Sequence, residues 1–366
     1  MRMKKSKPEI AVIGAGAVGL STALCIKQTI PSVNVTVVAD KFLDETLSYG
    51  AGGFFRPEVN IGKDRSTIKQ WANDSYERYS LLARAEPESG NSFVSGYQLS
   101  SYSADSMRNE LIEAIVPEPV RNLTASEMSR FPAHFKYGIA WNSIITDPRY
   151  YLPYLQKKID NLGGRLLKQH IDSFEEFFIK NSSYDLLVNC TGFEASRLTD
   201  DHLIIPVRGQ AFKVKADWIK NFYFADGAYV LPGRDYVTVG GIKEFGSSNT
   251  AISKLDSHSI WTRCLELVPS LSDSKIIHEW VGIRPHRQPV RVELEQWHSN
   301  RDSSLRRIIV HNYGHGAHGI TLSWGTAIDA TRLVLQGLTN AIAENHRSDN
   351  HPCEHDNLSS SSRAKL

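Results

Sequence analysis

The sequence predicts an α/β protein with a Rossmann-like domain built on a parallel sheet and a second, mainly antiparallel β domain. Three observations predict it. A strand, a glycine-rich turn and a helix follow one another near residues 10–28, and the same succession returns near 308–340. Between 205 and 300 the pattern changes to short β-rich segments. With 366 residues, the chain is long enough for two domains with an ample core.

Composition and charge narrow the class of protein. The chain is 41% hydrophobic and 22% charged, and 42 Lys and Arg against 40 Asp and Glu give a formal net charge of +2. That mild balance argues against a nucleic-acid partner. The four cysteines lie far apart without a CxxC motif, so we expect neither a disulfide framework nor a metal site.

The amino terminus imitates a signal peptide, because four basic residues precede the apolar run from Ile10 to Ile26. Pro8 and Glu9 stand at the junction, however, and glycines interrupt the run with a spacing that has a better explanation. No other segment approaches the roughly 20 apolar residues that span a bilayer, so no membrane partner is expected.

The elements are predicted in order from hydrophobic periodicity and turn residues. Helices are expected at 17–28, 66–84, 150–162 and 254–267, and strands at 10–13, 33–39, 93–102, 166–174, 186–189, 210–214, 228–231, 236–240 and 282–294. A final strand, turn and helix occupy 308–340. The Rossmann-like domain therefore comprises 8–55, 146–204 and 305–342, the second domain 56–145 and 205–304, and a polar, flexible tail 343–366.

The first βαβ unit carries the fingerprint Gly14-x-Gly16-x-x-Gly19, and Asp40 follows its second strand. Gly14 permits the tight turn, Gly16 lets a pyrophosphate approach the backbone, and Gly19 allows close packing of helix on strand. Asp40 is placed to accept hydrogen bonds from a ribose. The fingerprint predicts a dinucleotide but does not separate FAD from NAD. Gly50-Ala51-Gly52-Gly53 offers a second close backbone approach, suited to a bulky flat ring.

The carboxyl-terminal segment is the most specific one. His311-Asn312-Tyr313-Gly314 is followed by Gly316-Ala317, Gly319 and Gly325-x-Ala327, so bare backbone N–H groups gather at a helix N-terminus near Ile320. This arrangement resembles the signature of the D-amino-acid oxidase family of flavoproteins. The resemblance covers nearly the whole chain, with further matches at Val188-Asn189-Cys190-Thr191-Gly192, Arg208-Gly209-Gln210, Pro232-Gly233, Gly240-Gly241 and Gly282-Ile283-Arg284-Pro285.

The resemblance implies an FAD enzyme that oxidises D-amino acids to imino acids by hydride transfer from Cα to flavin N5. The imino acids hydrolyse to 2-oxo acids and ammonia, and dioxygen is reduced to hydrogen peroxide. FAD contacts are then expected from residues spread along the chain: Gly14, Ala15, Gly16, Val18, Gly19, Asp40, Lys41, Thr46, Ser48, Gly52, Gly53, Ile171, Thr191, Gly192, Gly316, Gly319, Ile320 and Thr321.

The resemblance also assigns the substrate contacts. Arg284 corresponds to the arginine that holds the α-carboxylate, and Tyr229 to the tyrosine that adds a third point of attachment. The backbone of Ala317 is expected near the substrate amine, and His318 is expected to face the pocket. A neutral amine needs no protein base, so no acid–base role is assigned to His311, His315 or His318.

The family has one branch for neutral D-amino acids and one for D-aspartate and related acidic substrates. Lys243 stands where the acidic branch carries arginine, and Arg56 could supply a second cation, since a buried carboxylate needs a partner. Ala225 replaces a lid-like tyrosine of the neutral branch. We therefore expect acidic substrates; the alternatives are that Lys243 and Arg56 are solvated loop charges and that the enzyme is a broad oxidase of neutral D-amino acids.

The last residues, Ala364-Lys365-Leu366, resemble the Ser-Lys-Leu peroxisomal address. They predict a peroxisomal matrix enzyme that binds the import receptor, a sensible place for chemistry that produces peroxide. Two other classes remain open at this point: a non-catalytic dinucleotide-binding protein and an NAD-dependent dehydrogenase. The sequence does not give the oligomeric state.

Overall fold

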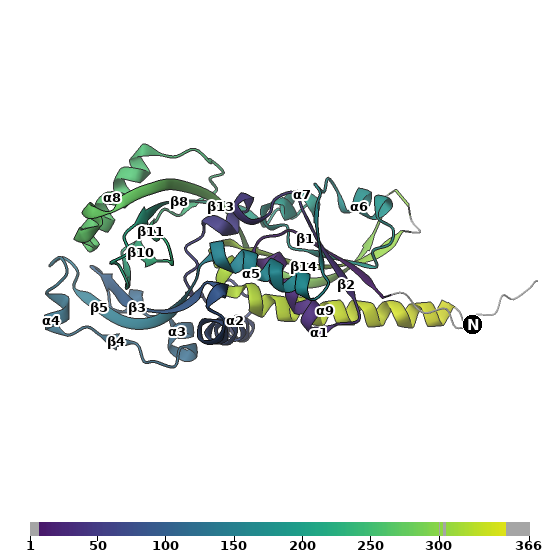
Figure 1. Cartoon of the computed structure of the whole chain (residues 1–366), viewed down its shortest axis with the longest axis horizontal. Coiled ribbons are helices and arrows are strands. Elements are labelled where there is room, and N and C mark those ends of the chain that lie inside the picture. Colours follow the sequence, from purple (N-terminus) through teal and green to yellow (C-terminus); the bar gives the residue numbers. More distant parts are fainter. Residues whose placement is uncertain (1–6, 300, 303–304, 349–366) are drawn as a thin grey trace, which may run out of the picture.

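The computed structural model describes residues 7–299, 301–302 and 305–348. Its two halves lie end to end along the long axis, and a single sheet of 14 strands runs through both of them (Figure 1). Along this sheet the strand order is β4-β5-β3-β9-β10-β11-β8-β13-β14-β7-β1-β2-β6, with β12 paired to β8. The predicted α/β class with a Rossmann-like part and a mainly antiparallel part is therefore confirmed.

The Rossmann-like half holds the parallel strands. They are β1 (Glu9–Ile13), β2 (Asn34–Ala39), β6 (Arg165–Lys168), β7 (Leu186–Asn189) and β14 (Arg306–His315). Its helices are α1 (Ala17–Thr29), α5 (Pro148–Asn161), α6 (Phe174–Lys180), α7 (Ala195–Leu198) and α9 (Gly319–Ser348).

Both faces of this parallel sheet are covered, because side chains alternate along each strand. Ile10 and Val12 belong to the large apolar cluster that includes α1, α5 and α9. Ala11 and Ile13 point to the other face, where Phe174 and the rest of α6 form a separate cluster. The near-continuous apolar runs of β1 and β2 follow from this burial.

The other half is mainly antiparallel. Its strands are β3 (Asn91–Ser100), β4 (Arg121–Asn122), β5 (Tyr137–Thr146), β8 (Ile205–Lys215), β9 (Phe222–Ala225), β10 (Ala228–Pro232), β11 (Val237–Gly240), β12 (Glu244–Phe245) and β13 (Lys275–His298). Only β3 and β9 pair in parallel among them. Three further helices are α3 (Glu110–Ile115), α4 (Ala125–Met128) and α8 (Lys254–Leu267).

The predicted strand over 166–174 is wrong in its second part. Strand β6 ends at Lys168, and helix α6 begins at Phe174. Ser173 caps this helix, because its Oγ accepts a hydrogen bond from the Glu176 N–H at 3.1 Å. The apolar residues of the segment therefore serve two elements rather than one longer strand.

Helix α2 (Arg65–Ala85) contacts both halves, because it packs on β3 as well as on α9. It falls in the range 56–145 assigned to the second domain, yet it packs on α9 of the Rossmann-like half (Figure 1). Trp71 Nε1 donates to Asp329 at 2.6 Å, and the Tyr79 hydroxyl donates to the Ile320 carbonyl at 2.6 Å. Periodicity predicted the helix but carried no information about which half its apolar face would meet.

The predicted tail also begins too early. Helix α9 continues beyond the expected boundary at residue 342 and ends at Ser348. Ala341, Ile342, Ala343 and Glu344 tolerate or favour the helical conformation, so the helix of the preceding segment propagates through them. The remainder of the predicted tail lies outside the described residues. Within the described residues, no helix combines the length and apolar character needed to cross a membrane.

Lys213 is a buried cation on β8 that supports the segment between β2 and α2. Its Nζ donates to Thr238 Oγ1 at 2.9 Å and to the Ala51 carbonyl at 3.2 Å. Burial lowers the pKa of Lys213 to about 8 from its ordinary value of 10.5. The unfolded chain therefore binds this proton more tightly than the folded protein does, and burying the charged lysine costs stability below pH 8.

We predict that the free energy of unfolding rises by up to ~1.4 kcal/mol per pH unit between pH 8 and 10 through this group alone, because loss of the proton leaves Lys213 neutral in the folded protein and removes the cost of burying its charge. Replacing the lysine by a neutral donor, Lys213→Gln, should remove this slope. Urea denaturation of both proteins across pH 7 to 10 measures the free energy of unfolding. Subtracting the two values at each pH cancels the contributions of all other titrating groups. A difference that stays constant with pH would show that Lys213 keeps an ordinary pKa.

Candidate active site

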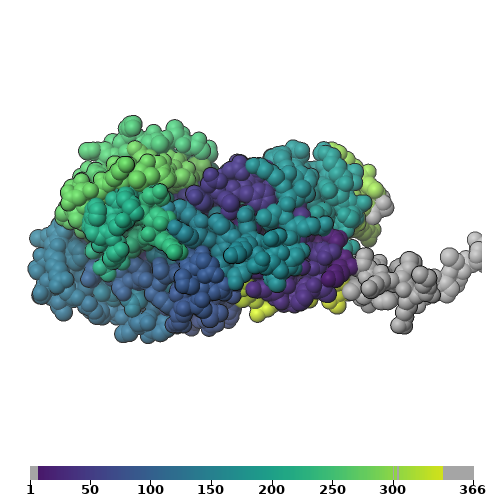
Figure 2. Space-filling model, in the orientation of Figure 1, coloured from purple at the N-terminus to yellow at the C-terminus, as the bar shows by residue number. Residues whose placement is uncertain are grey.

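A deep cavity of ≈ 1250 Å³ lies where the two halves meet. Gly14 and Asp40 line it in the Rossmann-like half, and Tyr229 and Arg284 line it in the antiparallel half. The segment around residue 50, dark purple in Figure 2, lies between the green antiparallel part and the teal Rossmann-like part. The cavity thus brings together residues from nearly every region of the sequence.

The glycine fingerprint forms one end of the cavity. Gly14 has a φ of +107°, and a Cβ there would lie 2.4 Å from the Cys190 carbonyl oxygen. A Cβ on Gly19 would lie 1.9 Å from the Gly14 carbonyl oxygen, which confirms that this glycine allows helix α1 to pack on the strand. At Gly16 an added Cβ would meet only the Ser48 hydroxyl, at 3.0 Å. The backbone before α1 is therefore bare toward the cavity, as a pyrophosphate requires.

Asp40 and Lys41 follow β2 and line the same end of the cavity. The Asp40 carboxylate lies 3.4 Å from Nδ1 of His170, which also lines the cavity and was not predicted. Ile171, a further predicted contact, is not among the lining residues, and its side chain belongs to the apolar cluster with Phe174. Successive residues point to opposite sides here, so the polar neighbour faces the cavity and the apolar one faces the core.

The middle of the cavity is lined by backbone-rich turns, as predicted. Gly53 has a φ of +65°, and a Cβ there would lie 1.9 Å from the Thr146 carbonyl oxygen. The other predicted lining residues in this part are Ala15, Val18, Thr46, Ser48, Gly52, Thr191 and Gly192. The Ser48 hydroxyl also accepts a hydrogen bond from the Ala17 N–H at 3.0 Å, so the turn is tied to the start of α1.

Trp280 is a lining residue that sequence reasoning missed. Its ring passes between two glycines: a Cβ on Gly50 or on Gly282 would lie 2.1 or 2.0 Å from ring atoms. The sequence signal for this packing was Gly282, which lies two residues after Trp280 and therefore on the same face of the strand. Its meaning depends on the segment around Gly50, which is distant in sequence.

The carboxyl-terminal glycine turn closes the cavity from the opposite side. Strand β14 runs to His315, a short turn follows at Gly316–His318, and α9 begins at Gly319. Gly316, Ala317, His318, Gly319, Ile320 and Thr321 all line the cavity, as predicted. The unpaired N–H groups and the positive dipole end of this helix therefore meet whatever occupies the cavity there.

The clamp residues lie at the far end from the fingerprint. Arg284 stands on β13, and its Nη1 donates to the Ile242 carbonyl at 3.3 Å and to the Arg208 carbonyl at 3.5 Å. Its guanidinium lies flat against Gly209, where an added Cβ would come within 2.3 Å of it. Tyr229 pairs with Gly240 across β10 and β11, and its ring covers Gly240 and Gly241. Burial raises the pKa of Tyr229, so its hydroxyl stays a hydrogen-bond donor at neutral pH.

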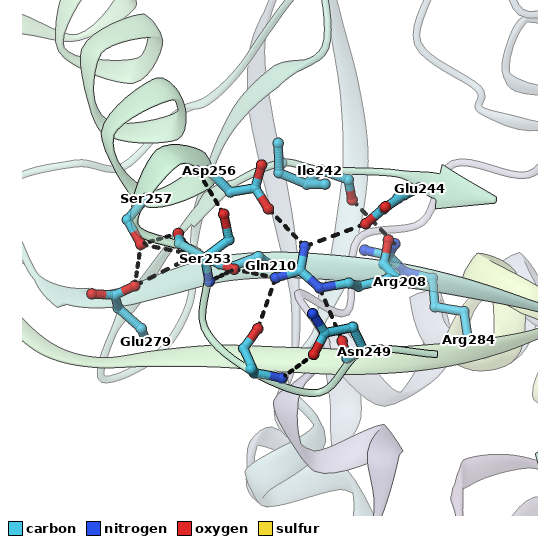
Figure 3. Close-up of polar contacts among 12 residues, drawn as sticks. Arg208, Gln210, Ile242, Glu244, Asn249, Ser253, Asp256, Ser257, Glu279 and Arg284 are labelled. Atoms are coloured by element: carbon cyan, nitrogen blue, oxygen red, sulfur yellow. Dashed lines mark hydrogen bonds and ion pairs between the residues drawn. The ribbon is translucent and has the colours of Figure 1, made fainter. Parts of the chain in front are cut away.

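A buried polar network stands behind Arg284 (Figure 3). The Arg208 side chain is 2% exposed, and all three of its nitrogens have partners. It donates to Asp256 at 2.7 Å, to Gln210 at 2.5 Å, and to the carbonyls of Asn249 and Ala251, both at 3.0 Å. Because its charge is compensated, Arg208 can hold its own backbone carbonyl next to Arg284 without leaving a buried charge unpaired.

Two basic side chains, a histidine and a carboxylate line the cavity near the clamp. Arg56, Lys243 and His318 line the cavity as predicted, and Glu58, which was not predicted, lines it beside them. Glu58 lies 3.8 Å from Arg56 and 3.5 Å from Nε2 of His318. The hydrogen bond from His318 lowers the pKa of Glu58 to about 2, so the carboxylate is ionised. The sequence signal for Glu58 was its position two residues after Arg56. The sequence alone does not show, however, which way the side chain of a loop carboxylate points.

The other histidines of the segment serve structure, as predicted. His311 Nε2 lies 2.8 Å from Glu295, its Nδ1 lies 3.2 Å from Asn189 Nδ2, and burial lowers its pKa. His315 is buried beside Thr326, and burial lowers its pKa to about 3. His311 does not line the cavity, and a histidine as hard to protonate as His315 is a poor proton store at neutral pH.

This geometry defines a class of protein: a Rossmann-like enzyme that holds a large dinucleotide between two glycine turns and binds the carboxylate of a second, smaller molecule beside it. The sequence profile described as FAD dependent oxidoreductase (DAO) matches residues 9–333, and the chain belongs to this family. FAD is its cofactor, and the bare turns at Gly14–Gly16, Gly52–Gly53 and Gly316–Gly319 fit a dinucleotide with a bulky flat ring.

Curated relatives agree. The chain is 37% identical to D-aspartate oxidase of Homo sapiens over 89% of this chain and 94% of that protein. It is 31% identical to D-aspartate oxidase 1 of Caenorhabditis elegans over 91% and 99%, and 32% identical to a D-amino acid oxidase of Dugesia ryukyuensis over 91% and 99%.

Solved structures show the same fold at low identity. Glycine oxidase from Geobacillus kaustophilus superposes with a TM-score of 0.71 at 17% identity, covering 89% of this chain and 94% of that one. L-proline dehydrogenase from P. horikoshii gives a TM-score of 0.68 at 16% identity, covering 91% and 94%.

We predict that Gly209→Ala displaces the guanidinium of Arg284, because the new methyl group would occupy its place. The affinity for a simple carboxylate such as propanoate should fall by about tenfold or more, the effect of losing a charge-assisted contact. Titration of the flavin absorption spectrum with propanoate measures it. Flavin content serves as the control for folding, and unchanged propanoate affinity would remove Arg284 from the carboxylate site.

Proposed function

We propose that this protein is a D-aspartate oxidase: an FAD-dependent enzyme that oxidises D-aspartate and D-glutamate to the 2-oxo acid, ammonia and hydrogen peroxide. The observation that carries the proposal is one cavity with a carboxylate clamp, Arg284 and Tyr229, and a further pair of cations, Arg56 and Lys243. An acidic D-amino acid has two carboxylates, and each needs a partner when it leaves water. Two of the three relatives described above carry the name D-aspartate oxidase.

The clamp fixes the substrate by its α-carboxylate. A planar guanidinium matches the two oxygens of a carboxylate, and contact with Gly209 and two backbone carbonyls holds the guanidinium of Arg284 in place. The Tyr229 hydroxyl makes no hydrogen bond with any other described residue and is free to donate to the same carboxylate. Two donors in fixed positions determine how the Cα hydrogen is presented.

FAD, when bound, supplies the two-electron acceptor that oxidation of the Cα–N bond requires and returns the electrons to dioxygen. The chain's own contribution is position and charge. The N-terminus of α9 places partial positive charge along the cavity wall, where it stabilises any negative charge that develops during the reaction. The cationic surroundings also favour the neutral form of the substrate amine, so no side chain needs to remove a proton from it.

The side-chain carboxylate of the substrate is assigned to Lys243 and Arg56. Lys243 is exposed at the cavity, and its Nζ lies 5.2 Å from the centre of the Phe245 ring. Arg56 is more buried and lies over the ring of Phe224 at 5.8 Å. Lys243 is therefore the cation that can move to an incoming carboxylate, while Arg56 provides fixed positive charge.

We predict brisk oxygen uptake with D-aspartate or D-glutamate and none with L-aspartate. Lys243→Met should lower kcat/KM for D-aspartate about tenfold while changing it much less for D-asparagine, which has the same shape without the charge. An oxygen electrode with both substrates measures the ratio. Brisk uptake with D-alanine or D-proline but not with the acidic substrates would instead identify a broad oxidase of neutral D-amino acids.

We also propose that the protein acts in the peroxisomal matrix, imported through Ala364-Lys365-Leu366 and its receptor. The tripeptide lies outside the described residues, so the proposal rests on the sequence and on the expected production of hydrogen peroxide.

The localisation prediction is that a fluorescent protein fused to the amino terminus of the full chain enters peroxisomes. Removal of residues 364–366 should leave the same fusion in the cytosol, because the import receptor reads a free carboxyl-terminal tripeptide. Fluorescence microscopy with a peroxisomal marker compares the two. Import of the shortened fusion would mean that the address lies elsewhere.

A further inference from the structure

Glu58 is an acidic residue inside a cavity whose proposed substrate is acidic. It lies two residues after Arg56 in the segment that follows the Gly52-Gly53 turn. One of its oxygens lies 3.8 Å from Arg56 Nη1 and the other lies 3.5 Å from His318 Nε2. Its side chain is 35% exposed and lines the cavity, so its charge can interact with a bound substrate.

Arg56 depends on this carboxylate. Among the described residues, Glu58 is its single ion-pair partner, and its Nε is buried without a hydrogen-bond partner. Burial lowers the pKa of Arg56, and Glu58 opposes that shift. The guanidinium of Arg56 therefore has an N–H group without an acceptor and only one long ion pair. It can still donate hydrogen bonds to a further acceptor, such as a substrate carboxylate.

We propose that Glu58 is a resident counter-ion that competes with the side-chain carboxylate of the substrate for Arg56 and His318, and thereby limits the enzyme's preference for acidic substrates. This inference rests on the proposed function. When an acidic side chain enters, two carboxylates share one set of cations in a partly buried site, and their repulsion opposes binding. Lys243 lies nearer to solvent, where water and salt weaken its attraction, so it compensates only in part.

The opposite role is that Glu58 positions Arg56 for the substrate. The two roles predict opposite signs. If Glu58 competes with the substrate, removing its charge should increase the preference for an acidic side chain. If Glu58 positions Arg56, removing its charge should decrease that preference.

The experiment replaces the carboxylate by an amide of the same shape, Glu58→Gln. The ratio of kcat/KM for D-aspartate over D-asparagine should rise about tenfold, the effect of removing one repulsive charge at short range. A matched control is Glu45→Gln, which removes a carboxylate that lines the same cavity but pairs with Lys168 at 3.0 Å. The control should leave the ratio as it is. A ratio that is unchanged or lower in Glu58→Gln overturns the proposal.

A double-substitution cycle sharpens the result. Arg56→Met removes the arginine partner of Glu58, leaves His318 as the other, and should raise the KM for D-aspartate strongly. Adding Glu58→Gln to Arg56→Met should recover part of that loss, because the remaining repulsive charge disappears. No recovery in the double variant would contradict competition by Glu58.

Binding without turnover separates this inference from the proposed function. Succinate has the two carboxylates of D-aspartate without the amine, and propanoate has one. Titration of the flavin spectrum should show that Glu58→Gln binds succinate about tenfold more tightly relative to propanoate than the unmodified protein does. If the unmodified enzyme oxidises neither acidic substrate, the proposed function fails, while the succinate-to-propanoate ratio still supports or overturns the competition.

Discussion

The site depends on one constraint, the double pairing of β13. This 24-residue strand pairs with β8 along its first part and with β14 along its second part. Its register places Arg284 opposite Val207 and, two residues later, His286 opposite His315, where β14 passes into the glycine turn. A single strand thus fixes the distance between the carboxylate clamp and the turn that begins α9. A shift by one residue would turn Arg284 to the other face of the sheet, so the buried pattern of β8 protects the register of the site.

Close backbone approach is the second requirement, and it explains why glycines stand beside the working side chains. Arg284 lies against Gly209, and the Tyr229 ring lies against Gly240 and Gly241. Any Cβ at these positions would fall within 2.3 Å of the clamp atoms. The paired network of Arg208 then stabilises the strand that carries Gly209, so a second buried arginine does not repel the first without compensation (Figure 3).

The sequence predicted those parts of the fold and site that local pattern determines. The fingerprint glycines, β7 and α8 follow from spacing, periodicity and capping, and the structure confirms them. The packing partner of α2 could not be predicted, because an amphipathic helix does not reveal which apolar surface it will meet. Glu58, His170 and Trp280 were missed for a related reason: each is an ordinary loop or strand residue until a distant segment lies beside it. Lys243 was found through the family resemblance, and Arg56 through the need to balance a substrate charge.

Charge balance also explains how a cavity with so many cations can handle an amino group. The α-carboxylate and the side-chain carboxylate of an acidic substrate each meet a cation. The amine does not, and the positive surroundings destabilise its protonated form. Glu58 is the lining carboxylate that lies beside Arg56 and His318, and a carboxylate there could also stabilise an ammonium group. Its ion pairs with Arg56 and His318 direct its charge elsewhere. Glu58, which we propose limits the preference for acidic substrates, therefore does little to stabilise a protonated substrate amine. Oxidation can then proceed without a dedicated base.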